Sequence, residues 1–316
     1  MKIGVLANPL SRRNRKLLPA IEALLGRYSD VVYVRLDRFD ELGRALQRFA
    51  EARIEVLIIS GGDGTIAASL TQIFEHEVFA ERPQLAILAG GTSNTIAGDI
   101  GLRGRPLDAL ERCLHAFAHA PESCEVVERN LIRVDYDREK PALCGMFFGT
   151  AAVCDGIILR RRLFPQTWLP DAIAAAMTLA VVLGTAALGR HGVLSGQSIA
   201  VNLDGVPTAP RQYTIAIATT LDRILLGGDP FWGEGPGAIK FTTIGSPPRG
   251  LVRHAYRLLY GGDRKRLPPA TYASVTADRI TLNMDCPFNL DGEFYEPGPG
   301  GEVILSRTPP ARFVRC

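Results

Sequence analysis

The sequence lacks the features that mark several large classes of protein. Its six cysteines form no Cys-x-x-Cys pair, and none is spaced from the five histidines as a zinc site requires. They therefore predict reduced, mostly buried thiols. The 36 basic and 33 acidic residues leave a net charge of only +3, which argues against a nucleic-acid partner. Repeats and low-complexity tracts are also missing from the 316 residues.

Signals for secretion or membrane insertion are equally scarce. The first apolar run, Ile3 to Ala7, is short and leads directly into Asn8-Pro9, unlike a signal peptide. We therefore expect a cytoplasmic protein, with membrane association left open.

One segment, 172–189, is uncharged over eighteen residues and only just reaches transmembrane length. Because it is rich in alanine, it favours a buried or domain-bridging helix. The alternative is a helix that lines an acyl-chain groove or touches a bilayer, with Arg160 to Arg162 meeting lipid phosphates.

Glycine is plentiful at two points where an apolar strand should end. The first is Ser60-Gly61-Gly62-Asp63-Gly64-Thr65, which follows Val56–Ile59 and precedes a helix-like segment. Glycine lets backbone N–H groups approach phosphate oxygens, and the start of a helix adds partial positive charge. Since a carboxylate repels phosphate, Asp63 is better suited to Mg²⁺, a hydroxyl or a ribose. A tight strand-to-helix turn without a ligand is the alternative.

The second glycine-rich point is Gly90-Gly91-Thr92-Ser93-Asn94-Thr95, after the strand-like run 84–89. Two such units in succession predict neighbouring parallel strands whose carboxyl ends share one crevice, where open α/β sheets bind ligands. Thr92, Ser93 and Asn94 also suit a helix cap, and a cap is compatible with a phosphate contact because both use the same N–H groups.

The pattern of apolar residues predicts two domains. In residues 1–125, strand-like runs at Ile3–Ala7, Val31–Leu36, Val56–Ile59 and Leu85–Leu88 alternate with helical patterns, which indicates a Rossmann-like α/β domain with a parallel sheet. The glycine-rich loops after two of these strands make it the candidate nucleotide-binding domain. Residues 126–290 predict an antiparallel, sandwich-like domain. Its expected strands are Leu131–Tyr136, Ser198–Leu203, Tyr213–Thr219, Ile239–Ile244, Tyr272–Ala277 and Arg279–Met284. Residues 291–316 form a tail that we expect to pack back on the first domain.

Four motifs together resemble the diacylglycerol kinase catalytic-domain family, which includes bacterial lipid kinases, sphingosine kinases and ceramide kinases. They are Asn8-Pro9-Leu10-Ser11, Gly61–Thr65, Ile87–Ala97 and Leu290-Asp291-Gly292-Glu293. The resemblance implies a diacylglycerol kinase and NAD kinase-like fold. It also implies an ATP-dependent enzyme that uses Mg²⁺ to phosphorylate a hydroxyl of diacylglycerol or a related lipid alcohol.

The resemblance also implies roles for particular residues. Those that would contact the nucleotide are Asn8, Gly61, Gly62, Asp63, Gly64, Thr65, Gly91, Thr92 and Asn94. Asp63 would also bind Mg²⁺ or orient the hydroxyl. Glu293 would be the general base and Asp291 its partner, facing Asp63 across a cleft. Without the resemblance, Asp291-Gly292-Glu293 would suggest an ordinary hairpin turn.

The chain departs from the family pattern at several positions. Ala67-Ala68 stands where the family usually has Asn-Glu, and Arg12 stands where it has glycine. The region of Asp229 and Glu234 matches the family's structural Mg²⁺ site poorly, so we carry over no structural metal site, and the sequence does not decide whether one is present. Two other functions therefore stay open: an NAD kinase, and a catalytically weak regulator that binds nucleotide or lipid. The sequence decides neither the acceptor nor whether the chain forms a homodimer.

Overall fold

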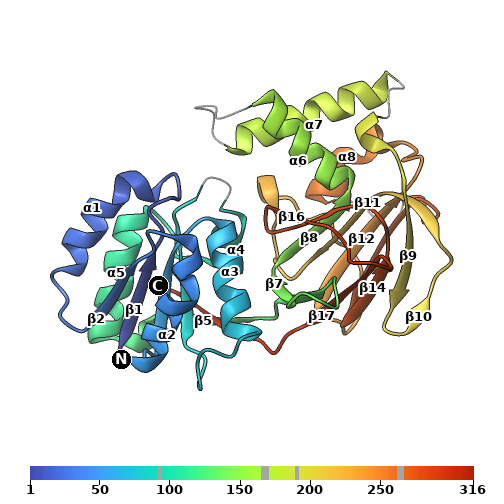
Figure 1. Cartoon of the computed structure of the whole chain (residues 1–316). Coiled ribbons are helices and arrows are strands. Elements are labelled where there is room, and N and C mark those ends of the chain that lie inside the picture. The colour runs from blue at the N-terminus through green and yellow to red at the C-terminus, as the bar shows by residue number, and fades with distance from the viewer. Residues whose placement is uncertain (92–93, 165–170, 189–191, 262–266) are drawn as a thin grey trace. The chain divides into compact units, whose positions relative to one another are not determined.

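The structure, a computed structural model, describes residues 1–91, 94–164, 171–188, 192–261 and 267–316 and forms two compact units (Figure 1). Unit 1 combines Met1–Arg129 with Pro309–Cys316, and unit 2 is Asn130–Thr308. Unit 1 therefore contains both ends of the chain.

Unit 1 is built on a six-stranded sheet in the order β2-β1-β3-β4-β18-β5. Its strands are β1 (Ile3–Ala7), β2 (Val31–Arg35), β3 (Val56–Gly61), β4 (Gln84–Ala89), β5 (Glu125–Arg129) and β18 (Ala311–Arg315). The first four are parallel, and each begins and ends within two residues of its predicted bounds. Strands β1 and β3 are buried along their whole length, as expected for a parallel sheet covered on both faces.

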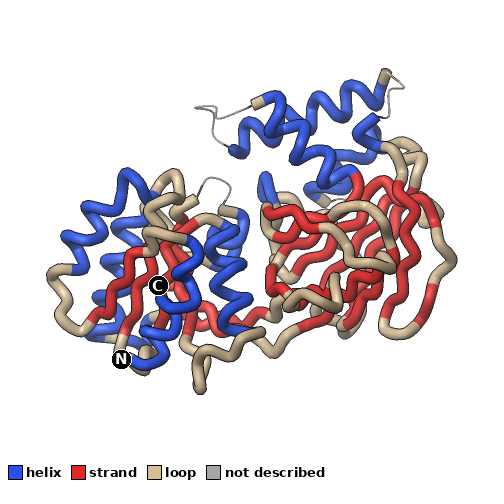
Figure 2. The backbone as a smooth tube through the Cα atoms, in the orientation of Figure 1, coloured by secondary structure: helices blue, strands red, loops and turns tan. Residues whose placement is uncertain are grey.

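Helices cover both faces of this sheet (Figure 2). They are α1 (Asn14–Leu25), α2 (Leu42–Glu51), α3 (Asp63–Phe74), α4 (Thr95–Ile100) and α5 (Pro106–His119). The helices α1 and α5 pack against one face through Ile21, Leu110 and Leu114. On the other face α2 packs beside α3. The predicted α/β fold with a parallel sheet is confirmed.

The last strand of the chain, β18, lies inside the sheet of unit 1, between β4 and the edge strand β5. Strand β18 pairs parallel to β4 and antiparallel to β5, so the sheet is mixed at this end. Cys316, just after β18, forms a disulfide with Cys124, just before β5. The prediction of reduced thiols is therefore wrong for this pair, because strand pairing brings together two cysteines that are 192 residues apart in sequence. The other four, Cys113, Cys144, Cys154 and Cys286, are buried free thiols.

Unit 2 is built on a curled antiparallel sheet, which confirms the predicted antiparallel second domain. Its path runs β16-β15-β8-β11-β9-β14-β17-β6-β7, with β10 on β9 and with β12 between β11 and β13. The strands are β6 (Ile132–Asp135), β7 (Leu143–Gly145), β8 (Phe147–Ala151), β9 (Gln197–Leu203), β10 (Val206–Pro207), β11 (Arg211–Thr219), β12 (Ile239–Gly245), β13 (Tyr272–Ala277), β14 (Arg279–Asn283), β15 (Phe288–Leu290), β16 (Glu293–Tyr295) and β17 (Glu302–Arg307).

Strand β11 is where the sheet of unit 2 divides. Its first residues, Arg211–Tyr213, pair with β9, and its later residues, Ile215–Thr219, pair with β8. On its other side β11 pairs with β12. The curled sheet encloses a core of apolar side chains that includes Phe148, Phe241 and Phe288.

Three helices lie together at one end of unit 2: α6 (Ala152–Leu163), α7 (Asp171–Ala187) and α8 (Leu251–Tyr260). Helix α7 contacts both of the others and packs on a small core with Val182, Leu251 and Leu258. The predicted buried helix is thus buried on one face only, and its expected last residue, Gly189, lies outside the described residues. Within the described part of the chain, we find no helix with the length and apolar character that a membrane crossing requires.

Candidate functional site

Three loops meet at the carboxyl ends of the parallel strands of unit 1. Strand register aligns Ala7 of β1 with Ser60 of β3, and Gly61 with Ala89 of β4. The loops that begin at Asn8, Gly61 and Gly90 therefore leave the sheet side by side. This edge is where open α/β sheets bind their ligands.

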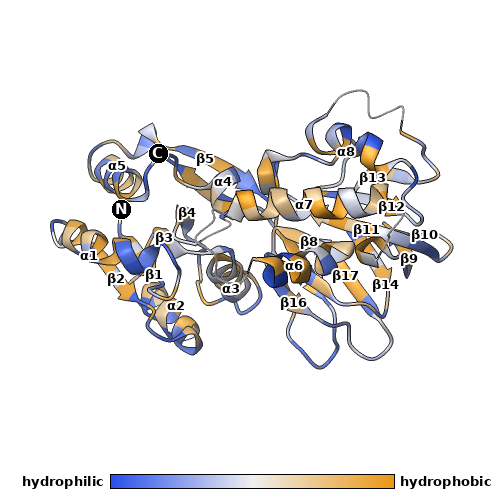
Figure 3. Cartoon of the chain, turned by 90° about the horizontal axis from the view of Figure 1, so that it is seen from above, coloured by the Kyte–Doolittle hydropathy of each residue, from blue (hydrophilic) through white to orange (hydrophobic). Residues whose placement is uncertain are grey.

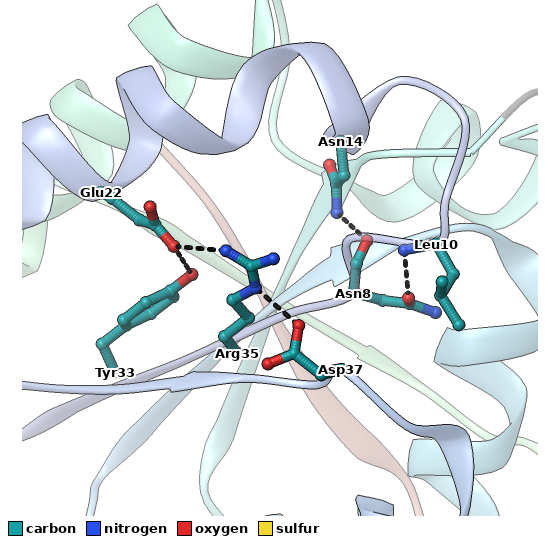
Figure 4. Close-up of polar contacts among 7 residues, drawn as sticks. All are labelled: Asn8, Leu10, Asn14, Glu22, Tyr33, Arg35 and Asp37. Atoms are coloured by element: carbon teal, nitrogen blue, oxygen red, sulfur yellow. Dashed lines mark hydrogen bonds and ion pairs between the residues drawn. The ribbon is translucent and has the colours of Figure 1, made fainter.

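Two buried asparagines join the loops (Figure 4). The Asn8 side chain donates to Thr65 Oγ1 at 2.8 Å and accepts from the N–H of Leu10 at 2.8 Å. Asn14, at the start of α1, donates to the carbonyl oxygens of Asn8 and Ser60 at 3.0 and 2.8 Å. Its Oδ1 accepts from the Ser60 hydroxyl. Since buried polar groups are costly to leave unpaired, these bonds hold the first loop against the second.

Glycines let the second and third loops touch. A Cβ on Gly91 would lie 2.5 Å from the Cα of Gly62, closer than atoms of this kind approach. A Cβ on Gly90 would overlap the Asn14 side chain. The two glycine-rich motifs therefore pack backbone against backbone. The N–H of Gly62 donates to Ser11 Oγ at 3.2 Å and the N–H of Gly90 donates to the Gly61 carbonyl at 2.9 Å. The backbone groups that suit a phosphate are therefore the N–H groups at the start of α3.

Asp63 connects the second loop with the helix that follows the third. Its Oδ2 accepts from the N–H of Thr95 at 3.1 Å, and its Oδ1 accepts from the N–H of Ile96 at 3.2 Å. The carboxylate thus satisfies two N–H groups at the start of α4, where negative charge is favourable. These contacts keep the half-buried Asp63 at the edge where the loops meet.

The third loop is closed by its own hydrogen bonds. Asn94 Oδ1 accepts from the N–H of Gly91 at 2.9 Å, and Asn94 Nδ2 donates to the Gly91 carbonyl at 3.0 Å. Asn94 has a left-handed backbone with φ of 50°, a conformation that asparagine tolerates better than most residues. Thr92, which the sequence assigns to the nucleotide site, lies outside the described residues.

Basic side chains surround the first loop. Arg12, Arg13, Arg15 and Lys16 follow Ser11 and are exposed. The N–H groups of Arg13 and Asn14 donate to the Gly90 carbonyl, so this segment is anchored to the third loop. Local positive charge of this kind attracts polyphosphates.

A further cation, Arg35, lies at the end of β2, in register with Ala7 (Figure 4). Arg35 Nε donates to Asp37 at 2.7 Å, and its guanidinium lies 3.7 Å from Glu22. The Tyr33 hydroxyl donates to the same Glu22 oxygen at 2.9 Å. Burial raises the pKa of Tyr33 above its ordinary value, and the bond to Glu22 adds to the effect, so the hydroxyl remains a donor.

The other predicted catalytic residues belong to unit 2, in the hairpin between β15 and β16. The buried Asp291 carboxylate accepts from the N–H groups of Met146 and Phe147 at 2.8 and 2.9 Å. Asn289 closes the turn by accepting from Gly292 N–H and donating to the Glu293 carbonyl, both at 3.0 Å. The Glu293 side chain is exposed at the end of this rigid turn.

Two residues that support these sites were missed by the sequence reasoning. Asn14 occupies a position of the apolar stripe of α1, with Leu18, Ile21 and Leu25, where a polar side chain must find a buried partner. That spacing could have revealed it. Arg161 of α6 donates to the Gly292 carbonyl at 3.2 Å and lies 5.0 Å from the centre of the Phe294 ring. Nothing in the sequence pairs Arg161 with that turn.

The residues of the three loops of unit 1 fit a nucleotide better than they fit a metal ion held by protein ligands alone. The backbone N–H groups at the start of α3 suit phosphate oxygens. No group of three or more His, Cys, Asp or Glu able to hold a metal occurs among the described residues. Mg²⁺ at nucleotide sites usually takes only one or two carboxylates besides phosphates, so Asp63 alone is compatible with it.

The fold defines a class. An α/β unit with glycine-rich loops at its carboxyl edge, joined to a curled antiparallel sheet, is a fold shared with a solved diacylglycerol kinase and with yeast NADH kinase. Residues 2–126 match the family model of the diacylglycerol kinase catalytic domain. The resemblance to that family is thereby confirmed, and unit 1 carries it.

Individual relatives are distant. An Enterobacter sp. (strain 638) protein named "Probable lipid kinase YegS-like" is 29% identical over 100 residues, which are 31% of this chain and 33% of that protein. The match thus spans about a third of the curated relative. A diacylglycerol kinase from Bacillus anthracis str. Sterne superposes with a TM-score of 0.61 at 15% identity, covering 99% of this chain and 96% of that one. Yeast NADH kinase superposes with a TM-score of 0.53 at 10% identity, covering 100% and 84%.

Proposed function

We propose that the protein is an ATP-dependent lipid kinase, which transfers the γ-phosphoryl group to a hydroxyl of diacylglycerol or a related lipid alcohol. The observation that carries this proposal is the close packing of Gly62 on Gly91 at the carboxyl edge of the parallel sheet. The match of residues 2–126 to a kinase family supports it.

In this proposal the loops of unit 1 hold the nucleotide. Backbone N–H groups of residues 61–65 and the start of α3 bind phosphates, while Gly91, Thr92 and Asn94 contact the nucleotide from the third loop. Asn8 holds Thr65 in place through its side-chain bond. ATP supplies the phosphoryl group, and Mg²⁺ would neutralise its charge with Asp63 as the protein ligand.

The acceptor chemistry is assigned to Glu293. As general base, its carboxylate takes the proton of the acceptor hydroxyl as the new bond from oxygen to the γ-phosphorus forms and the bond to the β-phosphate oxygen breaks, which releases ADP. Asp291 supports this role by fixing the turn that presents Glu293. Because the acceptor is an amphiphile, we also propose a peripheral contact with a membrane surface.

The proposal is tested by turnover. Purified protein with labelled ATP, Mg²⁺ and a panel of lipid alcohols should yield a phosphorylated lipid. Glu293→Gln should lower turnover by about 10²–10⁴-fold, and Asp63→Asn should lower it as well. The matched control is Glu296→Gln, an exposed glutamate three residues further on, which should leave turnover unchanged.

Two outcomes would replace the proposal. Phosphorylation of NAD and of no lipid would identify an NAD kinase. Nucleotide binding without turnover on any acceptor would identify a regulator, in line with Ala67-Ala68 standing where the family usually has Asn-Glu.

A further inference from the structure

Helix α7 has an unusual distribution of apolar side chains. One face, with Ala174, Thr178 and Val182, is buried against the rest of unit 2. In a helix bathed by water, the exposed part of the surface should be polar. Instead it presents Ile173, Met177 and Val181, whose exposed fractions are 46%, 45% and 42%. Residues 172–187 contain no charged side chain at all.

Large exposed side chains also occur on the residue that follows α7 and on the helix that contacts it. Leu188, the residue after the helix, is 78% exposed. Tyr256 and Tyr260 of the neighbouring α8 are also exposed, and their rings lie 5.4 Å apart. Figure 3, viewed onto α7, shows the hydrophobic colour along this helix. We call Ile173, Met177, Val181, Leu188, Tyr256 and Tyr260 the apolar face. A patch of this kind on a folded protein marks an interaction site.

Exposed positive charges lie on the two helices next to α7, whose only acidic residue is its first, Asp171. Arg161 and Arg162 are exposed in the last turn of α6, and Arg253 is exposed on α8. Helix α8 contains no acidic residue. Apolar side chains next to arginines and tyrosines are the composition of helices that lie in the interface of an anionic bilayer. Arginines meet the phosphates, and tyrosine rings sit at the level of the headgroups.

The same charges disfavour a second copy of this chain as the partner. In a symmetric dimer the identical patch occurs on both subunits, so the same positive charges would come from both sides of the interface. An anionic lipid surface, in contrast, complements both the charge and the apolar character.

We propose that the apolar face of α7 and α8 docks unit 2 on an anionic lipid bilayer. The face enters the boundary between headgroups and acyl chains, and the neighbouring arginines bind lipid phosphates. The proposal deepens the lipid-kinase function by naming the surface that meets the membrane. It rests on that function for the biological role of docking, whereas vesicle binding itself does not depend on kinase activity. Vesicle binding is measured without ATP or an acceptor.

The test is co-sedimentation with vesicles of phosphatidylcholine alone or mixed with phosphatidylglycerol. Wild-type protein should bind the mixed vesicles, and added salt should weaken that binding. The double variant M177E/V181E should partition at least about tenfold less, since it places charge in the apolar face. The matched control is Val206→Glu, which places the same charge on a valine of β10 in the same unit. Val206 is 68% exposed, and this variant should bind as wild type. Arg253→Gln should lower binding to the mixed vesicles about fivefold and leave binding to phosphatidylcholine vesicles unchanged.

Unchanged thermal unfolding shows that M177E/V181E is folded, and Leu188→Glu is the second variant if it is not. Wild-type binding to neither vesicle, or binding that these substitutions leave intact, overturns the proposal. So does a wild-type dimer in sedimentation velocity that M177E/V181E converts to monomer, which would make the face a self-interface.

An activity assay distinguishes failure of the docking proposal from failure of the proposed kinase function. The double variant should lose activity on an acceptor carried in mixed vesicles and keep it on a short-chain acceptor dispersed in detergent. If wild-type protein binds vesicles through this face but phosphorylates no lipid, the kinase proposal fails and the docking face stands. If lipid is phosphorylated but substitutions in the apolar face leave vesicle binding unchanged, only the docking proposal fails.

Discussion

Asp291 and Phe147 are joined by two hydrogen bonds of opposite direction. The N–H of Asp291 donates to the Phe147 carbonyl at 2.9 Å, and the N–H of Phe147 donates to Asp291 Oδ1 at 2.9 Å. The carboxylate is buried, so it fixes the β15–β16 turn to the start of β8. The two acidic residues of the turn therefore differ in role: Asp291 supports the structure, and the Glu293 side chain is exposed to solvent.

Substitution should reveal this division of roles. Asp291→Asn replaces one acceptor with a donor that faces an N–H group, so we expect the free energy of unfolding of unit 2 to fall by about 2–3 kcal/mol. Glu293→Gln should change it by less than about 0.5 kcal/mol while removing turnover. Urea unfolding and a kinase assay measure the two effects. Equal losses of stability in both variants would contradict the assignment.

The contact between the two glycine-rich loops predicts a strong effect of one methyl group. Gly91→Ala would place a Cβ 2.5 Å from the Gly62 Cα and force the loops apart. We expect at least about a tenfold loss of affinity for a fluorescent ATP analogue, because the N–H groups lose their alignment. Gly98→Ala is the control, since its Cβ meets nothing within 4 Å in α4. It should bind nucleotide normally and be equally stable or about 0.5–1 kcal/mol more stable. Normal binding by Gly91→Ala would show that the loops do not form the site.

The Cys124–Cys316 disulfide should stabilise unit 1. It closes a loop with a sequence separation of 192 residues, which restricts the unfolded chain. Cys316→Ser should lower the free energy of unfolding by about 2–5 kcal/mol. Cys113→Ser, at a buried free thiol of the same unit, is a comparison that leaves the link intact. Peptide mapping without reductant should recover the linked pair, and its absence would refute this prediction.

Asp155 on α6 should make the stability of unit 2 depend on pH. Burial raises the pKa of its carboxyl above the ordinary value. The protonated form is therefore the one that folding favours, and its contribution is present below the unfolded pKa and lost as pH rises through the folded pKa. Asp155→Asn stays neutral, so it should match wild type near pH 4 and be more stable near pH 7. Denaturant midpoints at the two pH values test this, and equal differences at both would contradict it.

Local patterns predicted the elements well and their partners poorly. The runs Val56–Ile59 and Leu85–Leu88 became β3 and β4 because a strand of consecutive apolar residues can only be buried on both faces of a sheet. The strands that the sequence did not predict are β5, β7, β8, β10, β15, β16, β17 and β18. Of these, β7, β15 and β16 have three residues each, which carry too little periodicity. Asn14 was missed because its partners, Asn8 and Ser60, come from other loops.

By itself, the sequence determined where strands end in glycine, and hence which backbone could approach a phosphate. Glycine and apolar spacing act over a few residues, so their consequences can be read locally. The tertiary structure alone decided that Asp63 binds the start of α4, that Cys316 reaches Cys124, and that one face of α7 is exposed. These outcomes depend on residues far apart in sequence, whose meeting is set by strand pairing and packing.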